Sequence, residues 1–229
     1  MPTGLPNLGA TCYMNAVVQS LYASCVFKDV VTNYTGNCII INSLKCRDNL
    51  KSLHECLPQY RLGRPHDAHE AMLTIIDALE KVTDSNVFYG ETSVNITSKT
   101  ENTTKTEKFG ALMFNPTTPC NMVDLFESLE KLEFITTNDE NGTFVCKHVT
   151  YKEFPKILPC IFLNQQQVKL PDEFKGRRLV SVIMHVGHKD AGHYMAVVRQ
   201  DDCWYLINDE QVLEVTRVPD YVYIAIYSL

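Results

Sequence analysis

Two stretches in the first ninety residues place apolar side chains at the three- and four-residue spacing of an amphipathic helix. The first starts near Cys12, where Thr11 is placed to cap the helix. The second covers about residues 66–82 and follows Pro65. Residues 23–62 lie between them without a chemical signature, and we interpret them as scaffold. The apolar positions are Met14, Val17, Val18 and Leu21 in the first helix and Ala68, Met72, Ile75, Ile76 and Leu79 in the second.

The second half of the chain carries the short apolar or alternating runs that are typical of β-strands. From Phe154 onward, turn-forming residues separate five such runs and predict an antiparallel sheet; the runs are residues 157–163, 179–185, 193–199, 203–207 and 221–227. Ahead of this sheet we predict a short strand over residues 109–114 and a helix over about 121–134. Asn141-Gly142 predicts a tight hairpin turn.

The length and charge of the chain limit its organisation and its partners. With 229 residues it can form one domain with a sizeable core, which we favour over two small domains. A net charge of −6 argues against nucleic acid as the main partner and is compatible with a basic one. Neither a signal-like N-terminal segment nor a run of eighteen apolar residues occurs, so we expect no association with a membrane.

Cysteine usage indicates a reducing compartment, and we expect a cytoplasmic protein. The nine cysteines are odd in number and irregularly spaced, and they include no Cys-x-x-Cys pair, unlike a secreted disulfide framework. Asn-x-Ser/Thr sequons matter only in a secreted chain. We therefore interpret the four sequons as chance; they begin at Asn33, Asn95, Asn102 and Asn141.

Cys12 is the candidate nucleophile. At the start of a helix the unpaired backbone N–H groups and the positive end of the dipole favour a thiolate, so a cysteine there is easier to ionise. An isolated cysteine is more often a small buried apolar residue. The catalytic interpretation gains weight from Gly192-His193, which leads into one predicted strand, and Asn208-Asp209, which follows another. Adjacent strands can place a histidine beside the amide or carboxylate that orients it.

Three stretches resemble motifs of the ubiquitin-specific proteases, a family of papain-like deubiquitinases. Residues 4–22 resemble the cysteine box of that family in the sequence GLPNLGATCYMNAVVQSLY. Residues 187–198 and 204–209 resemble its histidine box in the sequences GHKDAGHYMAVV and WYLIND. The segment 64–73, RPHDAHEAML, is similar to the family stretch Gln-Gln-Asp-Ala-x-Glu-Phe between those boxes. The blocks occur in the family's order, and the similarity is weak over about residues 91–150.

The resemblance implies an α+β, papain-like fold of the ubiquitin-specific protease type in one catalytic domain, residues 1–229. Its expected parts are a helical thumb over residues 1–90, a reduced fingers region over 91–150 and an antiparallel β palm over 151–229. The implied activity is hydrolysis of the isopeptide or peptide bond after the C-terminal Gly of ubiquitin by a thiol mechanism. Ubiquitin or its conjugates are the expected partners, no cofactor is expected, and we expect a monomer.

The resemblance also assigns roles to the catalytic residues. His193 becomes the general base and acid, and Asn208 aligns with the residue that orients it, with Asp209 as a secondary candidate. A plain Asn-Asp turn between strands is the alternative for that pair. Asn7 matches a residue that helps to line the oxyanion hole together with the backbone N–H of Cys12. Without the resemblance, an Asx turn in a loop would explain Asn7 better.

Asp67 and Glu70 match the carboxylates that hold the arginine-rich tail of ubiquitin in this family. From spacing alone, Asp67 is better explained as a negative charge that stabilises a helix start by about 0.3–1 kcal/mol. Gly192 and Tyr194, on either side of His193, complete the expected substrate-binding set. His66 and His69 are left as polar surface or groove residues.

We expect no metal site. The family often holds zinc in its fingers with two Cys-x-x-Cys pairs, whereas this region contains only Cys120 and Cys146. Cys146 and His148 would share one face of a strand, so a site that borrows other residues is the alternative.

Other functions remain open at this point. The enzyme could act on another ubiquitin-like modifier or on a viral polyprotein at a Gly-Gly site, because the small size is compatible with a viral or excised catalytic domain. The remaining alternative is an inactive ubiquitin-binding module, against which Cys12, His193 and Asn208 argue.

Overall fold

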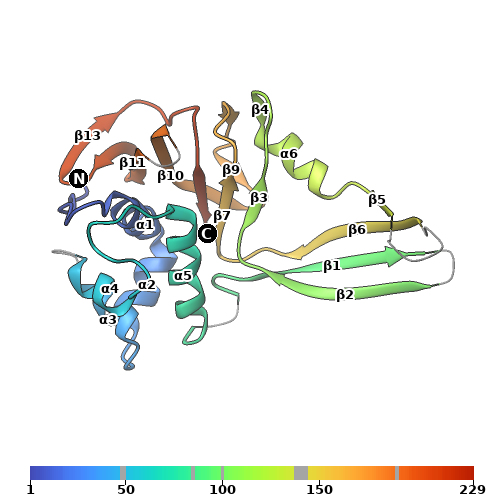
Figure 1. Cartoon of the computed structure of the whole chain (residues 1–229), viewed down its shortest axis with the longest axis horizontal. Coiled ribbons are helices and arrows are strands. Elements are labelled where there is room, and N and C mark those ends of the chain that lie inside the picture. The colour runs from blue at the N-terminus through green and yellow to red at the C-terminus, as the bar shows by residue number, and fades with distance from the viewer. Residues whose placement is uncertain (47–49, 84–85, 99–100, 137–143, 189–190) are drawn as a thin grey trace.

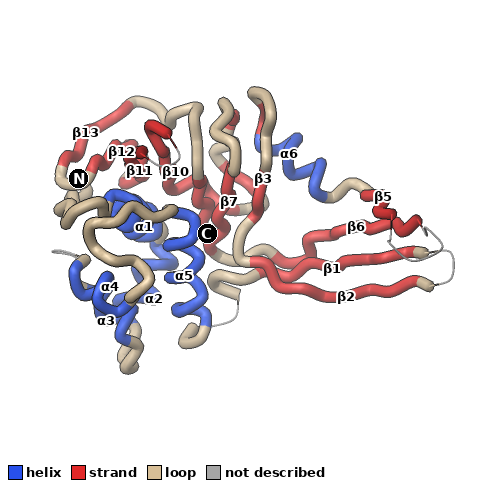
Figure 2. The backbone as a smooth tube through the Cα atoms, viewed as in Figure 1, coloured by secondary structure: helices blue, strands red, loops and turns tan. Residues whose placement is uncertain are grey.

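The computed structural model describes residues 1–46, 50–83, 86–98, 101–136, 144–188 and 191–229. Five helices gather at one end of the molecule (Figures 1 and 2). They are α1 (Cys12–Tyr22), α2 (Cys25–Asn33), α3 (Ile39–Lys45), α4 (Lys51–Cys56) and α5 (Ala68–Glu80). None of the helices among these residues is long and apolar enough to cross a membrane.

Helix α1 is the centre of this helical end, since every one of its residues is buried. Two of its polar side chains bond to the N-terminal segment: that of Asn15 donates to the carbonyl of Pro6 at 3.2 Å, and that of Gln19 donates to the carbonyl of Thr3 at 2.6 Å. Buried polar groups need such partners. Residues 3–6 therefore lie along the helix as part of its packing.

Both predicted helix starts differ in detail from the structure. Thr11 precedes α1 as expected, but its hydroxyl accepts from the Leu8 N–H at 2.9 Å and makes no capping bond, so the predicted side-chain cap is wrong. Helix α5 starts two residues later than predicted. The Asp67 carboxylate accepts from the His69 N–H at 2.7 Å and caps this helix, which leaves Pro65 and His66 ahead of it.

An eight-stranded sheet packs against the helices. Its order is β13-β12-β11-β10-β14-β7-β3, with β9 paired to β10 at one end of that strand. All pairs are antiparallel except β3 with β7, which is parallel, so the expected purely antiparallel palm needs this correction. The strands are β3 (Leu112–Phe114), β7 (Ile157–Phe162), β9 (Glu173–Phe174), β10 (Arg177–His188), β11 (Ala191–Gln200), β12 (Cys203–Asn208), β13 (Gln211–Val215) and β14 (Ile224–Ser228).

A four-stranded sheet projects away from the helices (Figure 1), in the order β2-β1-β6-β5. The strands are β1 (Gly90–Thr97), β2 (Asn102–Phe109), β5 (Glu133–Thr136) and β6 (Phe144–Glu153). The helix expected over about 121–134 is shorter, α6 (Met122–Leu129), and its predicted second half includes β5. The hairpin turn predicted at Asn141-Gly142 lies outside the described residues.

Residues from the expected fingers region also contribute to the palm. β3 completes the eight-stranded sheet, and α6 packs on that sheet through Phe126, whose ring lies 5.3 Å from that of Phe174. β4 (Cys120–Asn121), which directly precedes α6, forms a small parallel pair with β8 (Val168–Lys169).

The eight-stranded sheet separates two hydrophobic cores. Ile183, Ala196 and Ile207 belong to the core that the helices share with the sheet. Val182 and Ala225 belong to the second core, together with Phe126 of α6. Because strand residues alternate between the two faces, both sides of these strands are apolar. The start of β11 and the end of β12 lie near the start of α1, at the edge of the first core. The candidate site lies there.

Candidate active site

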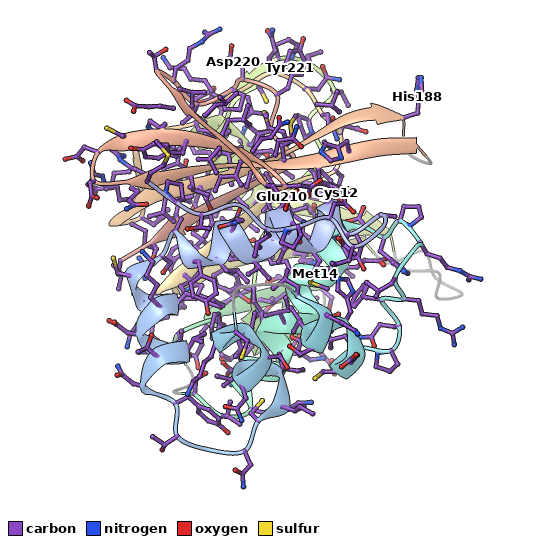
Figure 3. The ribbon with its side chains drawn as sticks, turned by 90° about the vertical axis from the view of Figure 1, so that its left-hand side faces the viewer. Cys12, Met14, His188, Glu210, Asp220 and Tyr221 are labelled. Carbon is purple, nitrogen blue, oxygen red and sulfur yellow. The ribbon has the colours of Figure 1, made fainter. Side chains whose placement is uncertain are left out.

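Cys12 is the first residue of α1 and lies where this helix meets the palm strands (Figure 3). It is 8% exposed, and burial is the main reason why the pKa of its thiol is raised above the ordinary value. The backbone N–H of Tyr194 lowers this pKa, and the negative charge of Asp209 raises it. The predicted ease of ionisation at a helix start is therefore outweighed by burial in this structure, and the resting group is a thiol.

His193 and Asn208 meet as the sequence predicted. The Nε2 of His193, on β11, lies 2.6 Å from the Oδ1 of Asn208, the last residue of β12. A carbonyl oxygen accepts, so Nε2 carries the proton in this pair. The neutral ring then has its lone pair on Nδ1. The Cys12 thiol lies beside the backbone N–H of Tyr194, the residue after His193.

Asp209 closes the site on the other side. β12 ends before it, and its φ of 50° turns the chain so that the carboxylate faces the N-terminal segment. Oδ2 accepts from Asn7 Nδ2 and Oδ1 from Asn15 Nδ2, each at 2.8 Å, and Oδ2 lies 3.9 Å from His193 Nε2. A regular strand would have pointed this side chain to the opposite face, so the turn is what brings Asp209 into the site.

Asn7 is held on both sides of its amide. Its Oδ1 accepts from the N–H groups of Gly9 at 3.0 Å and Thr11 at 3.2 Å, which is the Asx-type turn considered as its alternative. Its Nδ2 donates to Asp209, and one further proton of Nδ2 remains for another acceptor. The turn and the pairing with Asp209 together fix the amide close to the start of α1.

The segment that carries Asn7 is itself fixed to the turn after β12. The N–H of Leu5 donates to the Asp209 carbonyl at 2.9 Å. A Cβ at Gly4 would lie 2.5 Å from the carbonyl oxygen of Glu210, so only glycine allows this approach. The first residues of the chain therefore position the site.

The carboxylate of Asp67 lies across from the palm strands, where the Tyr223 hydroxyl donates to both of its oxygens at 2.7 Å. Burial raises the pKa of Tyr223, and Asp67 raises it further, because a phenolate would be repelled there. Burial likewise raises the pKa of Tyr194. Asp67 is therefore half-buried and acts as the cap of α5, while the neighbouring Glu70 is exposed.

Two adjoining grooves run between the start of α5 and the palm. The larger, of about 660 Å³, is lined by Asp67, Glu70 and Tyr194 and by residues of the loop after β7. The smaller, of about 330 Å³, shares these three residues and reaches Gly192. All four expected substrate-binding residues thus line these grooves, with Asp67, Glu70 and Tyr194 in both and Gly192, the residue before His193, in the smaller one.

Three residues of this region were not predicted from the sequence. Asn15 holds Asp209, Tyr223 holds Asp67, and His185 lies in both grooves. Asn15 could have been noticed as a polar residue three positions after Cys12, between apolar positions of the same helix. Nothing in the local pattern marks Tyr223, since its partner is 156 residues away.

The possible zinc ligands are not assembled among the described residues. Cys120 is on β4, paired with Val168, whereas Cys146 and His148 are on β6 in the projecting sheet. No group of three or more His, Cys, Asp or Glu side chains in the described part of the chain could hold a metal ion.

Comparisons with known proteins identify the family of the chain. The family model described as ubiquitin carboxyl-terminal hydrolase matches residues 3–227. The chain is 26% identical to ubiquitin carboxyl-terminal hydrolase 5 of Schizosaccharomyces pombe over 93% of its own length, and it spans 25% of that longer protein.

The fold is similar to that of solved structures. In the SAGA DUB module of Ubp8, Sgf11, Sus1 and Sgf73 bound to monoubiquitin, one chain matches with a TM-score of 0.81 and 16% identity. The same module bound to ubiquitin aldehyde gives 0.80 and 15%. Each match covers 99% of this chain and 69% of the other. The expected ubiquitin-specific protease fold is thus confirmed.

Proposed function

We propose, from the premise that this chain belongs to the ubiquitin carboxyl-terminal hydrolase family, that it is a thiol protease that removes ubiquitin from conjugates. The observation that carries the proposal is the convergence of Cys12, His193 and Asn208, which come from the two ends of the chain. A nucleophile, a base and a group that orients the base form the minimal set for acyl transfer.

In the proposed mechanism Nδ1 of His193 takes the proton of the Cys12 thiol as the sulfur attacks the carbonyl carbon of the last glycine of ubiquitin. Asn208 holds the ring through Nε2 and stabilises the imidazolium that forms. The imidazolium then gives its proton to the leaving amine, and a thioester remains. Water, deprotonated by His193, attacks the thioester and releases the ubiquitin carboxylate and the thiol.

The raised pKa of Cys12 fits a proton transfer that is coupled to attack. Because burial raises the pKa of the thiol and disfavours the thiolate, transfer of the proton to His193 as the sulfur attacks avoids forming the thiolate beforehand. The developing oxyanion would accept hydrogen bonds from the remaining N–H of Asn7 Nδ2 and from the backbone N–H of Cys12. Asp209 would act as a positioning residue, since its carboxylate fixes the amide of Asn7.

The acidic grooves support ubiquitin as the substrate. Asp67 and Glu70 would pair with arginines of the ubiquitin tail, and the smaller groove reaches Gly192, where the terminal glycines of the tail would lie. The solved relatives were captured with monoubiquitin or ubiquitin aldehyde, and they assemble with other subunits. A monomer in the cytoplasm remains our prediction, and light scattering of the purified chain would test its oligomeric state.

The experiment that tests the function is labelling with a vinyl-sulfone ubiquitin probe, followed by intact-mass measurement. We expect the wild type to gain the mass of one probe and Cys12→Ala to gain none. Cys25→Ala is the matched control, because Cys25 is an exposed cysteine at the start of α2 and should not affect labelling. Labelling of Cys12→Ala, or none of the wild type, would overturn the proposal.

Parallel probes built on other ubiquitin-like modifiers test the remaining alternatives. If one of them labels Cys12 more strongly than the ubiquitin probe does, that modifier is the preferred substrate and the same mechanism applies to it. Cleavage of Gly-Gly peptide bonds without labelling by any modifier would favour a processing protease.

A further inference from the structure

His185 lies at the junction of the two grooves. It is on β10 directly opposite Tyr194 of β11, and the two rings pack against each other in a tilted arrangement, with centroids 4.4 Å apart and an interplanar angle of 36°. Its ring also covers the Cα of Gly192, because a Cβ at that position would collide with His185 Nε2. His185 is therefore fixed between Tyr194 and the glycine that precedes His193.

The grooves place a set of charges around this imidazole. Across from it, at and before the start of α5, are Asp67 and Glu70 with His66 and His69, and on the palm side are Tyr223, Tyr194 and His193. Burial lowers the pKa of His185, Asp67 raises it, and His193 lowers it. At neutral pH the ring is thus uncharged. When it takes up a proton, its positive charge is attracted by the carboxylate of Asp67.

We propose that His185 is a specificity-determining residue: as the neutral imidazole it leaves Asp67 to an arginine of the incoming tail, and as the imidazolium it competes with that arginine for Asp67. The inference rests on the proposed function, since it assumes a basic tail in the acidic groove. It makes the preference of the groove for basic peptides dependent on pH.

The competition follows from linkage. An arginine that pairs with Asp67 neutralises the charge that favours protonated His185, so the pKa of His185 falls when the tail binds. A group whose pKa is lower in the complex must lose its proton on binding, and affinity then falls as the pH drops below the pKa in the free protein. The titration of His185 therefore weakens binding in acid and has no effect well above its pKa.

The test measures equilibrium binding of a fluorescent peptide with the sequence of the ubiquitin C-terminal tail between pH 5.5 and 8. Cys12→Ala is the background, so that no turnover occurs and protonation of His193 cannot act through chemistry. We expect affinity to fall by roughly fivefold or more toward acid pH. His185→Phe, which keeps the packed ring but cannot be protonated, should bind with an affinity that changes little.

Three controls make the result specific. His188→Gln changes an exposed histidine at the end of β10, outside the residues that line the grooves, and should retain the pH dependence. His185→Gln, as a second neutral replacement, should behave as His185→Phe does. The same peptide with its arginines replaced by glutamine should bind without pH dependence. Circular dichroism at each pH confirms that every variant is folded.

The proposal is overturned if the affinity of Cys12→Ala, with His185 intact, is independent of pH. It is also overturned if the pH dependence persists in both His185 variants. Loss of the dependence in His66→Gln or His69→Gln instead would assign the competition to one of those histidines and also overturn it. Failure of the proposed function is a different result: neither tail peptide nor ubiquitin would bind at pH 8, and the vinyl-sulfone probe would not label Cys12.

Discussion

At the scale of single residues, the adjacent side chains of Asn208 and Asp209 make different contacts in the site. Asn208 continues the strand and reaches His193, while Asp209 turns back to the N-terminal segment. Of these two side chains only Asp209 carries a formal negative charge; burial raises the pKa of the Cys12 thiol, and this charge raises it further. The neutral partner thus orients the base, and the charged partner fixes the amide of Asn7.

Replacing Asn208 tests the orientation of the base. We expect Asn208→Ala to lower kcat roughly a hundredfold or more with a small change in KM, because the imidazole loses the acceptor that sets its tautomer. Asn208→Asp, which can still accept from Nε2, should retain much more activity. Steady-state hydrolysis of ubiquitin-rhodamine checks this, and equal losses in the two variants would contradict the role.

Alkylation of Cys12 by iodoacetamide tests the charge of Asp209. The wild-type rate should be low at pH 7 and rise at alkaline pH, because burial and Asp209 raise the pKa of the thiol. Asp209→Asn removes a charge that disfavours the thiolate, so the midpoint of the rate profile should move to lower pH. Glu210→Gln is an exposed neighbouring control and should leave the midpoint in place. A midpoint that stays or rises in Asp209→Asn would show that the carboxylate does not act on the thiol.

At the scale of elements, the start of α5 combines a cap with a wall of the groove. Asp67 caps the helix through His69 N–H and also accepts from Tyr223, so one carboxylate connects the helical end to the palm. The two interpretations of Asp67 at the level of sequence are therefore compatible. Asp67 caps the helix in the structure, and it also lines the grooves in which the tail is proposed to bind.

Two substitutions of Asp67 separate these roles. Asparagine still caps a helix but has no charge, so Asp67→Asn should leave the melting temperature nearly unchanged and cost on the order of 1.5–3 kcal/mol in kcat/KM for ubiquitin substrates. Asp67→Ala should in addition lower stability by about 0.5–2 kcal/mol. A Gly-Gly peptide that lacks arginines should be cleaved equally by wild type and Asp67→Asn. Equal losses on both substrates would mean that Asp67 shapes the groove and does not bind the tail.

At the scale of the whole molecule, aromatic packing connects the projecting sheet to the palm. The projecting sheet is anchored by aromatic residues at its base, where the ring of Tyr151 lies 5.0 Å from Phe109 and 5.1 Å from Phe126. Such contacts stabilise a strand end without ligands. Cys120 and Cys146 lie in different sheets, so they cannot form the pairs from which a zinc site is usually built.

Metal content tests this view. We expect purified protein to contain no stoichiometric zinc by elemental analysis, and EDTA to leave its melting temperature and ubiquitin-rhodamine activity unchanged. Cys146→Ser should likewise be stable. One zinc per chain that is removed only with unfolding would contradict the expectation.

The sequence by itself determined the residues whose positions depend on short-range pattern. Helical spacing placed Cys12 at the start of α1, and strand alternation placed His193 and Asn208 where two neighbouring strands bring them together. These features need only a few turns or one strand pair, so local periodicity and motif similarity predict them. The fold class followed from the same information through the resemblance to a family.

Only the tertiary structure decided what the distant segments do to each other. The contact of Asn15 with Asp209 joins residues 194 positions apart, and the packing of His185 on Tyr194 depends on the exact strand register. The direction of Asp209 depends on a turn that no periodicity predicts, and β3 joins the palm in parallel although the strand before it, β2, belongs to the projecting sheet. Such contacts arise from packing in three dimensions, and a local pattern contains no information about which segment will lie opposite.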